Sequence, residues 1–181
     1  FGKWPRADKE LLAQFHEGII VFTGCPSGAV QTRLRLGQWD EAVAEAAQLR
    51  DIFGAENFYV EVMDHGIDIE RRTHRQVLEI AKLMNAPLVA TNDAHYVRRD
   101  DRKIQDALLC INSGSRINDP DRFKFDGDGY YIRSSDEMRS LWSELPSACD
   151  STLEIAERCN VHFTTTKEGA NYMPDFPVPE G

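Results

Sequence analysis

Asp93 and His95 are the residues of this sequence whose types and spacing are best suited to chemistry. They close the stretch Pro87–Tyr96, which reads PLVATNDAHY. Side chains two positions apart on an extended chain share a face, so the carboxylate and the imidazole are expected to converge. Such a pair suits a divalent metal ion or general acid–base catalysis. A helix cap beside a surface histidine would give the same pattern, so the surrounding sequence has to decide.

Two further apolar runs also end in residues of metal-ligand type. Cys25 follows residues 18–24, and Asp64 and His65 follow residues 57–63. In parallel β/α architectures, functional groups gather at the carboxyl ends of the strands, so these residues would reach the same rim as the Asp-x-His pair. Thiolate, carboxylate and imidazole groups all bind zinc-like metal ions.

Some of these residues also have purely structural interpretations. Cys25 suits a small buried position at a turn. For His65 we favour a turn residue in the left-handed conformation, because Gly66 follows it and histidine tolerates that conformation. Glu61 lies within a predicted strand and would face a barrel interior, where its charge needs a partner.

The elements that position these residues alternate between strand and helix, as apolar β-branched runs and apolar residues at helical spacing indicate. We expect strands at residues 18–24, 57–63, 87–93 and 130–133, and helices at residues 8–17, 26–36, 40–53, 68–85, 100–113, 135–144 and 147–158. Helix caps are expected at Asp8, Asp40, Asp68 and Ser134. The alternation predicts an α/β fold with parallel strands, as an open doubly wound sheet or as part of a β/α barrel. Without a glycine-rich dinucleotide fingerprint or a phosphate-binding loop motif, the open nucleotide-binding folds are disfavoured.

The bulk composition argues against some functions. The 181 residues are 41% hydrophobic and carry a net charge of −9, which is unfavourable for a simple electrostatic nucleic-acid binder. That charge is still compatible with an enzyme whose metal ion handles a phosphate. Four cysteines without a CxxC pair indicate a reducing, cytoplasmic location, and no apolar run is long enough to span a membrane. The chain starts without Met and ends in a proline-rich stretch, so we expect a fragment of a longer protein.

Five motifs give the chain a resemblance to a known family. In order they are TGCPSG at 23–28, FYVEVMDHG at 58–66, VATNDAHY at 89–96, QDALLCI at 105–111 and FKF at 123–125. The sequence resembles the PHP (polymerase and histidinol phosphatase) domain of the bacterial replicative DNA polymerases, the polymerase III alpha subunits. It is most similar to the actinobacterial type, and the resemblance extends over essentially the whole chain.

The resemblance implies a distorted seven-stranded β/α barrel with a cluster of divalent metal ions, expected to be zinc, at one rim. Cys25, Asp93 and His95 match ligand positions of the family, and Asp93 and His95 are the residues expected to act in catalysis. By the same resemblance, Glu61 and His65 fall on a strand that carries no metal ligand.

The family's opening His-x-His motif and the ligands of its first four strands are absent from this chain. Residues 1–150 are therefore expected to be the C-terminal portion of the PHP domain, with strands five to seven, and residues 151–181 a linker and the start of the polymerase palm region. A partial barrel leaves open strand edges and an incomplete metal shell. We expect this chain alone to be inactive.

The resemblance also implies a function for the full protein. It would be a replicative DNA-directed DNA polymerase whose PHP domain is a metal-dependent 3′–5′ proofreading exonuclease, with Mg²⁺ serving a polymerase site elsewhere. The implied partners are a DNA primer-template, the sliding clamp and other replisome subunits, and not a membrane. Two alternatives stay open: an inactive structural or docking PHP domain, and a stand-alone PHP phosphoesterase, which the polymerase-like sequence after residue 145 disfavours.

Overall fold

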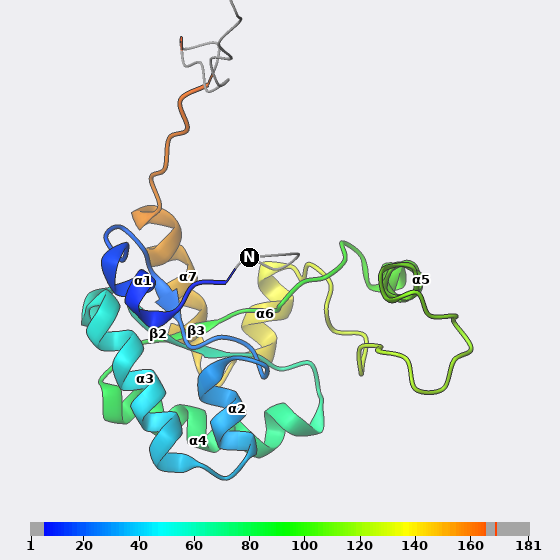
Figure 1. Ribbon diagram of the computed structural model, residues 1–181, viewed down its shortest axis with the longest axis horizontal. Helices are drawn as coiled ribbons and strands as arrows, with labels where there is room; N and C mark the ends of the chain where they lie inside the picture. Colours follow the sequence, from blue (N-terminus) through cyan, green and yellow to red (C-terminus); the bar gives the residue numbers. More distant parts are fainter. Residues whose placement is uncertain (1–5, 166–168, 170–181) are drawn as a thin grey trace, which may run out of the picture.

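A computed structural model describes residues 6–165 and Gly169 (Figure 1). Of the predicted segment 151–181, residues 166–168 and 170–181 lie outside the described residues. The described elements are, in order, α1 (Lys9–Gln14), β1 (Val21–Phe22), α2 (Ala29–Arg35), α3 (Trp39–Phe53), η1 (Ala55–Asn57), β2 (Phe58–Val62), α4 (Asp68–Met84), β3 (Leu88–Ala90), η2 (Arg99–Asp101), α5 (Arg102–Ser113), α6 (Ser135–Leu141) and α7 (Pro146–Arg158).

The described strands form a small parallel sheet in the order β1-β2-β3. Phe58 pairs with Val21 on one side of β2, and Glu61 pairs with Val89 on the other. All five residues of β2 are buried, as expected for a central strand that has neighbours on both sides. The predicted parallel α/β fold is confirmed, whereas the seven-stranded barrel and the palm region stay predictions.

The strands are shorter than the apolar runs suggest. The run 18–24 contributes only two residues to β1, and 87–93 contributes three to β3. Instead of the strand predicted at 130–133, a single parallel bridge joins Tyr96 to Tyr131. The ends of the apolar runs leave the ladder as loops, and these loops carry the candidate functional residues.

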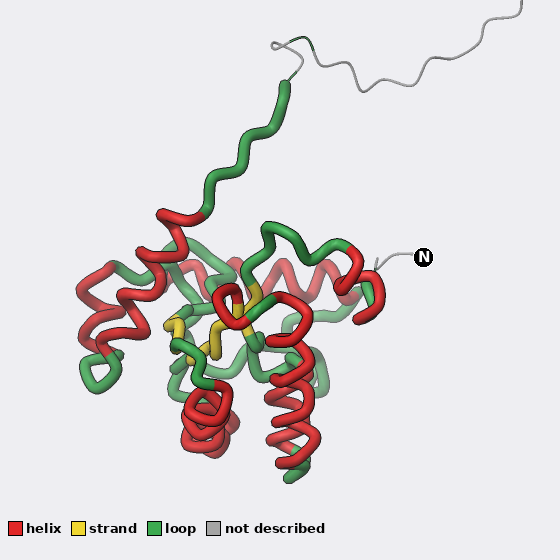
Figure 2. The backbone as a smooth tube through the Cα atoms, turned by 90° about the vertical axis from the view of Figure 1, so that its left-hand side faces the viewer, coloured by secondary structure: helices red, strands yellow, loops and turns green. Residues whose placement is uncertain are grey.

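Helices surround the small sheet (Figure 2). Their buried side chains and those of the strands form one hydrophobic core. Helices α2, α3 and α4 contact one another, α4 packs on β2, and α7 packs on β3. Ala42 and Ala46 of α3 are fully buried, because small side chains let neighbouring elements approach closely. Helix α7 spans the predicted boundary at residue 150, and its residues Ala148 and Cys149 belong to the core.

Two of the predicted helix caps are confirmed and two are wrong. The Asp8 carboxylate accepts the Leu11 N–H at 2.9 Å, and Ser134 forms a reciprocal capping box at the start of α6. Asp40 and Asp68 lie inside the first turns of α3 and α4 and do not cap them. A carboxylate in a first turn still interacts favourably with the helix dipole, which explains why the pattern looked like a cap.

The apolar residues of the predicted helix 100–113 do not pack on the core. Ile104, Leu108 and Ile111 of α5 are 61%, 53% and 77% exposed, and Cys110 is the buried residue of this helix. Figure 1 shows α5 set apart from the sheet, on the right of the molecule. Sequence periodicity identified the helix but not the direction in which its apolar face points.

None of the described helices is long and apolar enough to cross a membrane. All four cysteines are free thiols.

Ile80 and Leu83 of α4 provide a matched test of this core. Ile80 is fully buried and Leu83 is 61% exposed. We expect Ile80→Ala to lower the unfolding free energy of β2 by about 2–5 kcal/mol, because the lost methyl groups leave a cavity. Leu83→Ala should change this free energy by less than about 0.5 kcal/mol. Amide hydrogen exchange of residues 58–62 measures both values. Equal effects of the two substitutions would contradict the arrangement of α4.

Candidate functional site

Asp93 and His95 lie together just beyond the carboxyl end of β3. The His95 Nε2 and Asp93 Oδ1 atoms are 3.3 Å apart, and each side chain is 35% exposed. The pairing does not come from an extended chain, however, because Asp93 has a φ of 41° in the left-handed region. The two side chains do converge, as expected, but the expected cause, an extended strand, is wrong. A backbone turn at Asp93 brings them together.

His95 is fixed by the segment around Tyr130. The His95 N–H donates to the Tyr130 carbonyl at 2.8 Å. The imidazole ring lies 4.4 Å from the Phe125 ring and 5.9 Å from the Tyr130 ring, measured between centroids. Contacts from a distant part of the sequence therefore set both the backbone and the ring orientation of His95.

Asn92 joins the end of β3 to the same segment. Its Nδ2 group donates to the carbonyls of Gly129 and Tyr131 at 2.9 and 2.6 Å. A Cβ atom added at Gly129 would lie 3.4 Å from His65 Cδ2, and one added at Gly127, where φ is 80°, would lie 3.3 Å from the His65 carbonyl. The glycine loop can approach the rim closely because these positions have no side chain.

His65 forms a buried ion pair with Glu70 beneath this loop. Its Nδ1 atom lies 2.6 Å from Glu70 Oε1, and the two side chains are 1% and 6% exposed. Its Nε2 atom lies 2.9 Å from the Asn92 carbonyl, and its backbone N–H donates to Glu70 Oε2 at 2.7 Å. The ring stacks on Tyr130 at 3.9 Å between centroids. Because a carboxylate and a carbonyl both accept from the ring, the geometry suits the doubly protonated imidazolium.

Burial lowers the pKa of His65, but the hydrogen bonds to Glu70 and to the Asn92 carbonyl outweigh it, so the pKa is raised above its ordinary value of 6.5. The interpretation of His65 as a left-handed turn residue is wrong, since Asn85 and Asp93 are the non-glycine residues with positive φ in the described part of the chain. The sequence signal was available: Glu70, in the first turn of α4, follows His65 by five residues.

Glu61 is a second buried carboxylate near the rim. It is 6% exposed, and its Oε1 atom accepts the Thr91 hydroxyl at 2.6 Å. Burial raises the pKa of Glu61, the Thr91 hydrogen bond lowers it, and the charge of Asp93 raises it, with a raised pKa as the result. The partner expected for this interior charge is therefore a neutral hydroxyl.

Cys25 and Asp64 follow β1 and β2. The Cys25 carbonyl accepts the Gly28 N–H at 2.7 Å in the turn that leads to α2. Asp64 Oδ1 accepts the Gly66 N–H at 2.8 Å and so stabilises its own turn.

Sulfur, oxygen and nitrogen donors of the type that zinc prefers are thus present at Cys25, Asp93 and His95. Within the described ranges, no three His, Cys, Asp or Glu side chains lie close enough to hold a metal ion. The donors fit a metal ion in kind but not in number.

The buried ion pair makes the stability of the rim pH-dependent. Because the pKa of His65 is raised above 6.5 in the folded state, its stabilisation is complete below pH 6.5 and is lost as the pH rises through the folded-state pKa. We expect Glu70→Gln to destabilise residues 65–70 by about 3 kcal/mol at pH 6 and by less at pH 9. Hydrogen exchange corrected for intrinsic rates measures this, with the exposed Glu79→Gln on the same helix as the control. A pH-independent loss would exclude the imidazolium.

Comparisons with known proteins identify sequences that are similar to this chain. A family profile described as "PHP domain" matches residues 1–65, so the predicted bounds of 1–150 stay a prediction. The DNA polymerase III subunit alpha of Mycobacterium tuberculosis is 54% identical over 180 residues, 99% of this chain and 15% of that protein. The same subunit of Saccharopolyspora erythraea is 58% identical over 155 residues, 85% of this chain and 13% of that protein.

More distant relatives match over the same length. The DNA polymerase III subunit alpha of Thermus aquaticus is 32% identical over 186 aligned positions, which cover 100% of this chain and 15% of that protein. The chain thus spans about 15% of the length of the curated relatives that it matches most fully. It belongs to the DNA polymerase III alpha-subunit family, as a segment that includes PHP-domain sequence.

Proposed function

We propose that this chain is part of a replicative DNA polymerase, in which its PHP region contributes to 3′–5′ proofreading by phosphodiester hydrolysis. The observation that carries the proposal is the pairing of Asp93 with His95 at 3.3 Å beyond a strand end. A half-exposed carboxylate and imidazole in contact are suited to bind a metal ion or to move a proton. DNA primer-template is the proposed substrate, and the sliding clamp and other replisome subunits are the proposed partners.

In this proposal Cys25, Asp93 and His95 are ligands of a zinc cluster that further residues of the polymerase complete. Bound metal ions would activate a water molecule and stabilise charge on the phosphate oxygens. The residues of this chain fix the donors: the Tyr130 carbonyl holds the His95 backbone, and Asn92 holds the adjacent turn. A separate Mg²⁺ ion serves the polymerase site elsewhere in the protein.

An exonuclease assay of the full-length polymerase tests the proposal. We expect Asp93→Asn to lower the rate of excision from a mismatched primer at least a hundredfold and to leave nucleotide incorporation unchanged, because the substitution removes an anionic donor at the proposed site. Asp40→Asn, an exposed carboxylate in the first turn of α3, is the control. Undiminished excision by Asp93→Asn, or no excision by the parent protein, would refute the catalytic role.

Metal content provides a test that does not depend on activity. We expect Cys25→Ser and His95→Asn each to lower the zinc bound per full-length polymerase, because a neutral hydroxyl or amide is a weaker zinc ligand than a thiolate or imidazole. Cys159→Ser, at an exposed cysteine, should leave the zinc content unchanged. Elemental analysis after extensive dialysis measures it. Equal zinc content in all three variants would remove Cys25 and His95 from the ligand set.

A structural docking role is the second candidate, and the exposed apolar face of α5 favours it. Ile104, Leu108 and Ile111 form a stripe that does not pack on the core. Such a stripe suits contact with another protein surface. Under this alternative the parent polymerase would show no excision of its own, so the assay above also separates the two candidates.

A further inference from the structure

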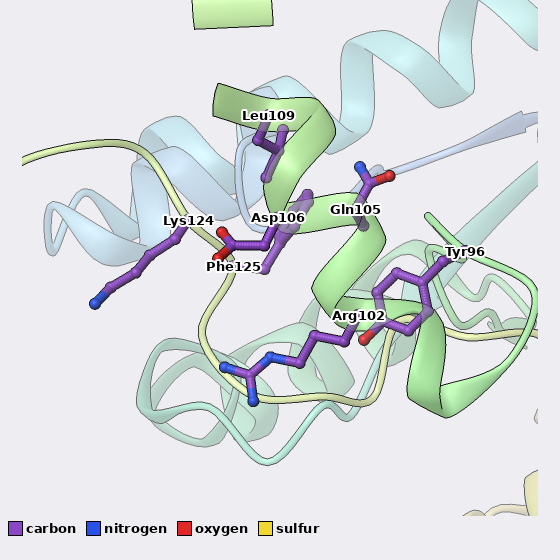
Figure 3. A pocket seen from close by; sticks show the side chains of 7 residues that line it. All are labelled: Tyr96, Arg102, Gln105, Asp106, Leu109, Lys124 and Phe125. Carbon is purple, nitrogen blue, oxygen red and sulfur yellow. The ribbon is translucent and has the colours of Figure 1, made fainter. Parts of the chain in front are cut away.

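The motif FKF at 123–125 lies beside a small cavity next to the candidate site. The cavity has a volume of about 40 Å³ and lies between α5 and this motif. Figure 3 shows that Arg102, Gln105, Asp106 and Leu109 line it from the helix, while Lys124 and Phe125 line it from the segment that runs alongside. A single water molecule needs about 10–15 Å³ of such a cavity. The cavity therefore accommodates a group with only a few oxygen atoms.

The side chains that line this cavity carry two positive charges, on Arg102 and Lys124, and one negative charge, on Asp106. Asp106 lines the cavity, but Arg122 neutralises it through a hydrogen bond of 2.7 Å from Nη2 to Oδ2. The carboxylate of Asp128 is likewise paired, with Arg99 at 2.8 Å. Arg102 and Lys124 are exposed and form no salt bridge with any described residue. Two available cations therefore lie beside a small cavity, an arrangement that suits an anion such as a phosphate.

Tyr96 adds an unsatisfied hydrogen-bonding group to the same cavity wall. Its hydroxyl is buried and has no hydrogen-bond partner among the described residues. Buried hydroxyls in folded proteins are normally paired, so an oxygen atom brought by a ligand would satisfy this group after a small movement of the ring.

A chain of aromatic rings connects this cavity to the candidate catalytic pair. Phe125 lies 4.4 Å from the His95 ring, and Phe123 lies 5.5 Å from Phe125, between centroids. Phe123 is 63% exposed, which leaves the ring available to a planar ligand. Exposed aromatic rings beside a cationic groove are the combination with which proteins bind single-stranded nucleic acids.

We propose that Arg102 and Lys124 bind a backbone phosphate, and Phe123 an adjoining base, of a single nucleic-acid strand whose end lies at Asp93 and His95. The choice of ligand rests on the proposed phosphodiester hydrolysis, since the same polar cavity beside another chemistry would take another anion. The strand supplies both the phosphate that suits the cations and the base that suits the ring.

Photocrosslinking in the full-length polymerase tests the subsite directly. The probe is a thymidine oligonucleotide with 4-thiothymidine as its second residue from the 3′ end. We expect crosslinks to map to peptides within residues 96–125. The yield should fall about tenfold in the Arg102→Gln/Lys124→Gln variant, because two charge-assisted contacts are lost. Arg35→Gln/Lys82→Gln, which removes two exposed cations from α2 and α4, should leave the yield unchanged.

Phe123→Ala examines the stacking contact separately. Loss of base stacking should lower the crosslink yield about fivefold or more. Phe15→Ala is a matched control, because Phe15 is 62% exposed and Phe123 is 63% exposed. All substituted side chains are exposed, and an unchanged hydrogen-exchange pattern in β2 will show that each variant is folded. Crosslinks elsewhere, or equal yields from parent and variants, would overturn the subsite.

Two comparisons separate this inference from the proposed function. The Asp93→Asn variant should crosslink like the parent protein while it loses excision. If the parent protein crosslinks but shows no excision, the exonuclease is refuted and the subsite is not. Normal excision with no crosslink in residues 96–125 would refute the subsite alone. Unlabelled oligonucleotide should compete at a concentration at least a hundredfold below inorganic phosphate. Equal competition by phosphate would refute strand binding.

Discussion

The rim of this fold depends on a charged imidazole buried between a carboxylate and a carbonyl oxygen. His65 follows β2, Glu70 lies in the first turn of α4, and Asn92 follows β3, so one side chain connects three elements that are separate in the sequence. Two charges removed from water are tolerable only when each is hydrogen-bonded, and here both ring nitrogens and the backbone N–H have partners. Removing one partner of such a pair typically costs about 3–5 kcal/mol. The pair therefore specifies how the loops after β2 and β3 meet.

This connection sets the geometry of the candidate site. Asp93 and His95 follow Asn92 directly, and Asn92 is held through its carbonyl by His65 and through its amide by residues 129 and 131. Tyr130, on which the His65 ring stacks, also holds the His95 backbone. Because Asp93 adopts a left-handed conformation, which is unfavourable for most residues, the surrounding contacts have to stabilise that turn. The site is thus built by loops whose shape is set by a buried electrostatic contact and not by the sheet alone.

Local sequence patterns identified the parts of the fold that depend on local interactions. The burial of β2, the end of α3 at Phe53 and the capping box at Ser134 follow from hydrophobic patterning and hydrogen bonding within a few residues. The residues of the candidate pair were identified, but their convergence was ascribed to an extended chain, and the turn at Asp93 depends on contacts with residues 129–131. The role of His65 was missed although Glu70 lies only five residues away, because its other partners, Asn92 and Tyr130, are distant in the sequence. The direction of the apolar face of α5 depends on tertiary contacts that periodicity does not contain.

The loop that contains Gly127 and Gly129 reads as ordinary turn sequence, yet it lies against the backbone and ring of His65 with no side chain between. Because Gly127 and Gly129 have no Cβ atom, the loop packs closely on His65 and excludes water from its ring. The dielectric constant around the imidazolium therefore stays low. The strength of an electrostatic contact after β2 is in this way set by the composition of a loop more than sixty residues further along the chain. A side chain at position 127, where φ is 80° and a Cβ atom would lie 3.3 Å from the His65 carbonyl, would push the loop away from the pair and loosen it without touching either of its charges.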